Sequence, residues 1–176
     1  MNWRGATTRQ DRIFAALVYL IPILEVAMLG FFLASLFPPL GLLLIGLTPL
    51  MQVYFFNVGG LPLVELGLFF GLFILVVRNS QVSHFLRFNT VQAILLSIFT
   101  FLCRLVLDVL ELSSGLSAPL LRPTGANPTA WLGGGLESLL FLAVLTAAIF
   151  AIAQSLRGQY ADLPIISEAA YNQVRY

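Results

Sequence analysis

Charged residues and cysteine are scarce in this sequence, and lysine is absent. Only 10% of the 176 residues are charged and 59% are hydrophobic, whereas about 25% of an average soluble domain is charged. Such a chain has too few polar groups to cover the surface of a soluble domain. The same composition excludes a disordered chain. Its single cysteine, Cys103, excludes an internal disulfide scaffold. Nine arginines and eight acids give a net charge of +1, which leaves no basic excess for nucleic acid.

Long apolar stretches replace the missing polar surface. A membrane-spanning helix needs about 20 apolar residues, and five stretches approach that length: residues 13–37, 40–56, 61–77, 88–112 and 131–156. The sequence therefore predicts an all-α, polytopic membrane protein whose partner is the lipid bilayer. We expect one membrane domain at 12–157, between an N-terminal tail at 1–11 and a C-terminal tail at 158–176.

The arginines indicate which stretches cross, because basic residues favour the cytoplasmic side. If residues 40–56 do not cross and the N-terminus is inside, only Arg122 is outside and Arg104 lies within a helix. The inside arginines are then Arg4, Arg9, Arg12, Arg78, Arg87, Arg157 and Arg175. If residues 40–56 do cross, the arginines divide evenly. We therefore predict four transmembrane helices, a short re-entrant or interfacial helix at 40–56, and both termini on the cytoplasmic or stromal side.

The beginning of the chain does not resemble a targeting segment. The first apolar stretch is long for the about 7–15 residues of a signal-peptide core, and no clear small-residue cleavage site follows it. Only eleven residues precede the predicted membrane domain. We expect neither a signal peptide nor a plastid transit peptide on this chain.

Polar residues follow one face of the fourth stretch. A spacing of three or four residues places them on one side of a helix: Ser97, Thr100, Arg104, Asp108 and Glu111. Arg104 and Asp108 can form an i, i+4 ion pair. Intramembrane charges normally face protein or water, so this candidate face either lines a polar cavity or fixes helix packing.

Three further acids lie in or near other apolar stretches. Glu65 and Glu137 are close to predicted helix starts, where the helix dipole favours an acid. Glu25 lies deeper, three residues after Pro22, and is the acid that we first expect to join the candidate face.

Small residues predict close helix packing or a partner interface in two places. Gly67 and Gly71 form a G-x-x-x-G pattern, and the last stretch repeats small residues every four positions: Ala143, Ala147, Ala151 and Ser155. The only histidine, His84, has no clustered ligands and is expected at headgroup level. We expect no catalytic set, no metal and no cofactor.

Three strings of the sequence resemble one known family. They are DRIFAAL with YLIP at 11–22, HFLRFNTVQAILL at 84–96, and QSLRGQYADLPIISEAAY at 154–171. Together they resemble the Tic twenty-kilodalton subunit family, from the translocon at the inner chloroplast envelope, with relatives in cyanobacteria and algal plastids. The resemblance covers residues from about 11 to the end, and the lack of a transit peptide favours a cyanobacterial or plastid-encoded member.

The resemblance implies four membrane helices and a part in preprotein import, or an undefined counterpart role in cyanobacteria. It implies other membrane subunits or further copies of the chain as partners, and a transiting polypeptide. The alternatives are a small solute or ion transporter, and a structural assembly subunit. The resemblance brings no catalytic residues, only family-marker positions: Arg87, Asn89, Gln92, Gln154, Arg157, Gly158, Tyr160 and Pro164.

Three of these markers are amides that lie at the membrane ends of helices. A buried amide needs a hydrogen-bond partner on another helix. We therefore expect Asn89, Gln92 and Gln154 to join the last two spanning helices on the cytoplasmic side.

Overall fold

The computed structural model describes residues 7–110, 128–163 and 166–174. The described residues are mostly helical, which confirms the helical class. Three helices within the described residues are long and apolar enough to cross a membrane: Arg9–Leu36, His84–Val109 and Trp131–Arg157. Two shorter apolar helices lie between the first and second of these, at Pro38–Tyr54 and Leu63–Val77.

The first long helix is a series of shorter segments. It consists of α1 (Arg9–Leu17), α2 (Leu20–Ala27), the 3₁₀ turn η1 (Met28–Gly30) and α3 (Phe31–Leu36). Its start is a capping box, in which the Thr8 and Asp11 side chains each accept the other's backbone N–H at 3.1 Å. Its first break, at Val18 and Tyr19, lies one turn before Pro22, which has no N–H to donate to the Val18 carbonyl.

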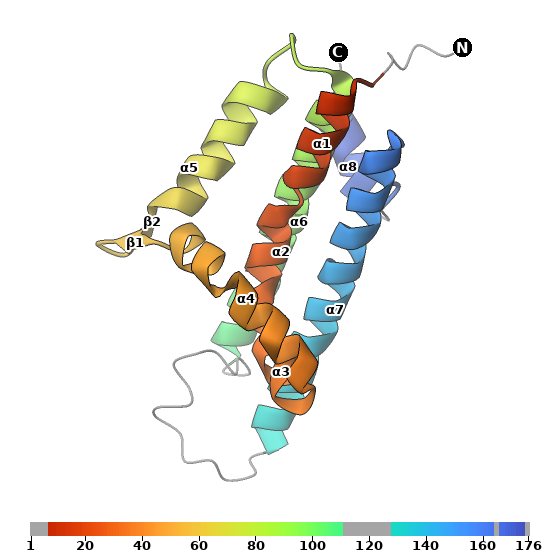
Figure 1. Ribbon diagram of the computed structural model, residues 1–176. Coiled ribbons are helices and arrows are strands. Elements are labelled where there is room, and N and C mark those ends of the chain that lie inside the picture. The colour runs from red at the N-terminus through yellow and green to blue at the C-terminus, as the bar shows by residue number, and fades with distance from the viewer. Residues whose placement is uncertain (1–6, 111–127, 164–165, 175–176) are drawn as a thin grey trace.

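Proline also separates α3 from α4 (Pro38–Tyr54). Phe37 is extended, with φ −130° and ψ 89°, because a residue before proline avoids the helical conformation. Helix α4 then crosses obliquely from α3 toward a two-stranded hairpin (Figure 1). The hairpin pairs β1 (Asn57–Val58) with β2 (Leu61–Pro62) and turns at Gly59 and Gly60, both at positive φ.

The remaining helices complete the bundle. Helix α5 (Leu63–Leu72) continues into the π-helical turn η2 (Phe73–Val77). Helix α6 (His84–Val109) begins four residues before the expected start of its apolar stretch, because Ser83 caps it by accepting the Leu86 N–H at 3.3 Å. Helices α7 (Pro128–Arg157) and α8 (Ile166–Gln173) follow.

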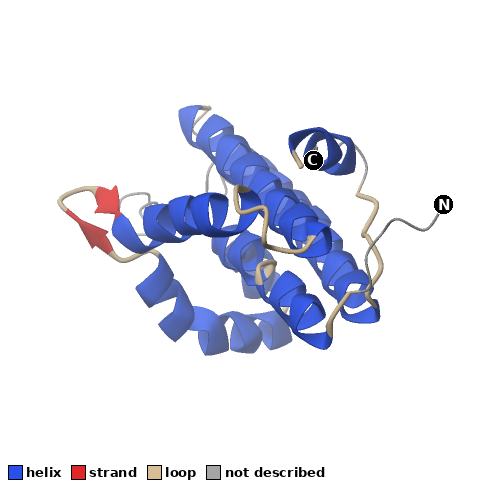
Figure 2. Ribbon diagram, turned by 90° about the horizontal axis from the view of Figure 1, so that it is seen from above, coloured by secondary structure: helices blue, strands red, loops and turns tan. Residues whose placement is uncertain are grey.

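The long helices pack side by side, with α8 against α6 (Figures 1 and 2). The start of α1, the start of α6, the end of α7 and α8 all lie at one end of the bundle (Figure 1). The largest core cluster joins Val26 of α2, Leu96 of α6 and Phe141, Val144 and Ala148 of α7.

Large apolar side chains cover the outside of the described molecule. On α4, Leu42 is 74% exposed and Leu43 is 68% exposed. A soluble protein would hide such an extended apolar surface, so this surface supports the expectation that lipid surrounds the bundle.

The two small-residue patterns have different surroundings. On α7, Ala151 and Ser155 are fully buried and Ala147 packs against the core, whereas Ala143 is exposed. On α5, a Cβ atom added at Gly67 or Gly71 would meet nothing within 4 Å. Packing within the described chain therefore explains three of the four small residues on α7, and it does not explain Ala143 or the glycines of α5.

Candidate functional site

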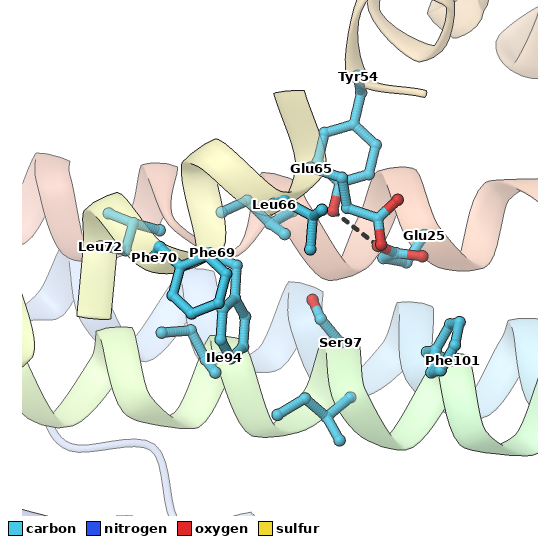
Figure 3. A pocket seen from close by; sticks show the side chains of 12 residues that line it. Glu25, Tyr54, Glu65, Leu66, Phe69, Phe70, Leu72, Ile94, Ser97 and Phe101 are labelled. Carbon is cyan, nitrogen blue, oxygen red and sulfur yellow. Dashed lines mark hydrogen bonds between the residues drawn. The ribbon is translucent and has the colours of Figure 1, made fainter. Parts of the chain in front are cut away.

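A buried carboxylate on α2 bonds to the end of α4. Glu25 is 5% exposed, and the Tyr54 hydroxyl donates to its Oε1 atom at 2.6 Å. Figure 3 shows both side chains beside Glu65 of α5. The hydrogen bond gives the buried carboxylate a partner and fastens α4 to the bundle.

Two cavities adjoin this carboxylate, and Glu25, Glu65 and Phe101 line both of them. The first cavity, which we call the apolar cavity, has a volume of about 240 Å³. Its other lining residues are Ile21, Tyr54, Leu66, Phe69, Phe70, Leu72, Ile94, Ser97 and Ile98. The second, the charged cavity, has a volume of about 350 Å³. Its other lining residues are Met28, Phe55, Asn57, Pro62, Arg104, Leu105 and Asp108.

The structure brings most of the candidate polar face to these cavities. Ser97 lines the apolar cavity, and Arg104 and Asp108 line the charged one, together with Glu25. Thr100 lines neither; it is 1% exposed, and its hydroxyl donates to the Leu96 carbonyl at 2.9 Å. The last member of the face, Glu111, lies outside the described residues.

The expected ion pair between Arg104 and Asp108 is not formed within the described chain. Arg104 instead lines the charged cavity together with Glu25 of α2 and Glu65 of α5. A helix-spacing rule considers one helix only, so it does not reveal that two other helices supply acids to the same cavity.

The other two acids differ in their surroundings. Glu65 is in the first turn of α5, as the dipole interpretation requires, and it also lines both cavities. Glu137 is the tenth residue of α7 and is 3% exposed. The helix dipole acts mainly within the first turn, so it does not explain Glu137.

A second polar cluster lies near the other end of the bundle. The Tyr19 hydroxyl lies 3.0 Å from Asn89 Oδ1 and 2.8 Å from Gln92 Oε1, and the Ser155 hydroxyl donates to Asn89 Oδ1 at 2.9 Å. The Gln92 amide nitrogen donates to the Ala161 carbonyl and to Ser167 Oγ, both at 3.1 Å. We call these residues the amide cluster; it joins the α1–α2 break, α6, α7 and the C-terminal segment.

The amide cluster answers the expectation about the three marker amides only in part. Asn89 and Gln92 do connect α6 with α7 and with the segment after it. Gln154 takes no part: its Oε1 atom is buried and has no partner among the described residues. Tyr19 and Ser167 were missed, because nothing in their local sequence separates them from ordinary helix residues.

Two of the other markers, Arg87 and Tyr160, make contacts at the same end of the bundle. Arg87 Nε donates to the Val77 carbonyl at 2.9 Å. The Tyr160 hydroxyl lies 3.1 Å from Nδ1 of the exposed His84, which begins α6, and the Tyr160 ring packs edge-on against Phe85 and Phe88. Gly158, at φ +75°, ends α7 after the exposed Arg157, and Pro164 lies outside the described residues.

Comparison with known proteins identifies the family. The model of the family described as "Chloroplast import apparatus Tic20-like" matches residues 8–170. A Tic20 family protein of Synechocystis is 37% identical over 167 residues, which cover 95% of this chain and 94% of that protein. In Arabidopsis thaliana, the chloroplastic protein TIC 20-v is 32% identical over 93% of this chain and 71% of its own length. The chloroplastic protein TIC 20-II is 27% identical over 96% of this chain and 74% of its own length.

These matches cover both cyanobacterial and plastid relatives, and they agree with the membrane-capable helices of the structure. The chain therefore belongs to the Tic20 family, as a multi-pass protein of a cyanobacterial or plastid membrane.

Proposed function

We propose that this chain is a non-enzymatic subunit of a protein translocon, acting in preprotein import in a plastid or in a counterpart role in a cyanobacterium. The observation that carries the proposal is the family match over residues 8–170, to a model described as a chloroplast import apparatus. The near full-length similarity to a cyanobacterial relative supports it.

The proposal includes a topology of four spans. The spans are Arg9–Leu36, Leu63–Val77, His84–Val109 and Trp131–Arg157, with α4 as an interfacial or re-entrant helix. The described arginines outside the bundle interior support it, because they cluster at the starts of α1 and α6 and the ends of η2 and α7, which share one end of the molecule (Figure 1). That end is cytoplasmic or stromal.

The span formed by α5 and η2 is short. At 1.5 Å per residue, its fifteen residues reach about 22 Å, whereas the hydrocarbon layer is about 30 Å thick. Helix α4 and the hairpin precede this span and run obliquely (Figure 1), so we infer that they complete the passage or thin the bilayer beside it.

The proposed partners are other membrane subunits or further copies of the chain. Four helices packed around apolar side chains do not enclose a wide pore, so passage of a polypeptide requires more than one such bundle. Affinity purification from the native membrane, with cross-linking to a polypeptide arrested during transport, tests this. The control is an unrelated multi-pass protein of the same membrane with the same tag.

We expect the tagged chain, and not the control, to enrich other membrane subunits and the arrested polypeptide. Purification of the chain without either would overturn the proposal. Ion or solute flux in liposomes that is lost in Glu25→Gln or Arg104→Ala would instead support the transporter alternative, since both residues line the charged cavity.

A further inference from the structure

Ser97 differs from the other buried hydroxyl groups in the helices. Thr90, Thr100 and Ser138 each donate to the carbonyl four residues earlier, at 2.8, 2.9 and 2.7 Å, as membrane-helix hydroxyls commonly do. Ser97 is 9% exposed, and its Oγ atom has no partner among the described residues. Figure 3 shows this hydroxyl pointing from α6 toward the side on which Glu25, Glu65 and Tyr54 lie.

Acidic side chains outnumber basic ones among the described residues that line the two cavities. Glu25 and Glu65 line both, and the one guanidinium, that of Arg104, lines the charged cavity. Asp108 adds a further acid to the lining of the charged cavity. A buried charge without an opposite charge is costly, so a cation that donates hydrogen bonds would complement both the carboxylates and the Ser97 hydroxyl.

The rest of the apolar cavity suits a hydrocarbon chain. Away from its polar end, the lining consists of side chains such as Phe69, Leu72, Ile94 and Ile98. Helix α5 packs mainly on η2, α4 and β1, and α6 packs on η2. The two helices therefore diverge beside the cavity, which lies between them (Figure 3). The charged cavity alone falls within the about 300–1,000 Å³ usual for small-molecule sites.

We propose that the two cavities together bind a membrane amphiphile that has one apolar chain and an ammonium head group. The chain occupies the apolar cavity between α5 and α6. The head group lies at Glu25 and Glu65, where it also reaches the Ser97 hydroxyl. This proposal is independent of the translocon role, because it concerns a site that the chain forms by itself.

Photolabelling of the purified full-length chain in an uncharged detergent tests the site. The probe is a dodecylammonium ion with a diazirine in its chain, and the matched probes carry a hydroxyl or a carboxylate head group on the same chain. We expect the ammonium probe to label α5 and α6 around Phe69 and Ile98 about tenfold more than the hydroxyl probe does, since the charge-assisted hydrogen bonds are lost with the charge.

Two matched pairs of variants separate binding from folding. Glu25→Gln keeps an acceptor for Tyr54 but removes the charge, and its control is Glu137→Gln, another buried acid that lines neither cavity. Ser97→Ala has as its control Ser138→Ala, which is equally buried at 9% exposed. We expect labelling to fall about tenfold in Glu25→Gln and severalfold in Ser97→Ala, and to remain in both controls.

A second measurement covers variants that fold poorly: the ammonium probe should raise the melting temperature of the unaltered chain more than the hydroxyl probe does. Equal labelling by the three probes, labelling of other helices, or equal losses in the control variants would overturn the proposal. Labelling by an apolar peptide with one lysine, and not by the alkylammonium, would also overturn it and assign the site to a polypeptide. A chain that binds the amphiphile but enriches no membrane subunit would contradict only the translocon proposal.

Discussion

The role of Tyr19 depends on residues that are distant from it in the sequence. Pro22 interrupts the helix before it, and Tyr19 lies at the break, where its hydroxyl reaches both Asn89 and Gln92 of α6. The hydroxyl can donate to only one of these oxygens at a time. The amide cluster is therefore a shared network, in which Gln92 bonds to Tyr19, Ala161 and Ser167.

The first prediction concerns Gln92. In Gln92→Leu, Tyr19 loses one of its two acceptors, the Ala161 carbonyl loses one of its two donors, and Ser167 Oγ loses one of its partners. Each hydrogen bond contributes about 0.5–1.5 kcal/mol net, so we expect the loss of three to lower the free energy of unfolding by about 2 kcal/mol or more. Thermal unfolding in detergent measures it.

Gln154→Leu is the control for that variant. Gln154 Oε1 has no partner among the described residues, so removing it deprives no donor of its acceptor. An equal loss of stability in the two variants would contradict the role assigned to Gln92.

The second prediction concerns Tyr54. Tyr54→Phe keeps the ring and removes the donor to Glu25. A buried acceptor that loses its donor costs about 1–3 kcal/mol, so we expect a loss of unfolding free energy of that order. The measurement is a double-mutant cycle with Glu25→Leu. Additive effects of the two substitutions would show that the hydroxyl and the carboxylate do not interact.

Sequence reasoning found some members of the candidate site and missed others for a physical reason. Glu25 and Ser97 interrupt apolar stretches, so each stands out without knowledge of the fold. Tyr54 ends an apolar helix, and its role depends on α4 lying against α2. Glu65 fits a helix start by itself, so its approach to Arg104 is visible only once α5 is placed.

At the scale of elements, local sequence determined where most helices begin and end. The capping residue Thr8, the pair Pro38 and Pro39, and the glycine pair of the hairpin act through backbone geometry within a few residues. The π-helical turn η2 has no such local signal. The helix break at Tyr19 does follow from Pro22. It is overlooked when an apolar stretch is judged by its length alone.

The C-terminal end of α7 gives the third prediction. The Gly158 N–H donates to the Ser155 carbonyl and the Gln159 N–H to the Gln154 carbonyl, both at 2.9 Å, which is a Schellman motif. A Cβ atom at Gly158 would also lie 2.7 Å from Arg12 Nε. We expect Gly158→Ala to lower the unfolding free energy by about 1–2 kcal/mol, measured by thermal unfolding.

Gly46→Ala, within α4, provides the comparison. Gly46 has no atom within 4 Å of an added Cβ, and alanine stabilises a helix interior relative to glycine by about 0.5–1 kcal/mol. The two glycines should therefore respond in opposite directions. Stabilisation by Gly158→Ala would contradict the role assigned to the left-handed conformation.

At the scale of the whole molecule, the composition predicted that lipid surrounds the chain. The positions of the arginines predicted which ends of the helices lie on the cytoplasmic or stromal side. The described arginines near helix ends do lie at one end of the bundle (Figure 1). The path of residues 38–77 could not be predicted from composition or from the arginines. Helix α4 and the span of α5 and η2 are both short, and hydropathy gives no direction for a helix that lies obliquely.

Cysteine labelling tests the proposed topology most directly. In a Cys103→Ala chain, single cysteines replace Thr7, Ser80, Leu110 or Gln159, and a membrane-impermeant maleimide is applied to sealed vesicles of each orientation. We predict labelling at 7, 80 and 159 from the cytoplasmic or stromal face, at 110 from the opposite face, and at all four after detergent is added. Labelling of 7 and 159 from opposite faces, or of 80 from the same face as 110, would contradict four spans with both termini in one compartment.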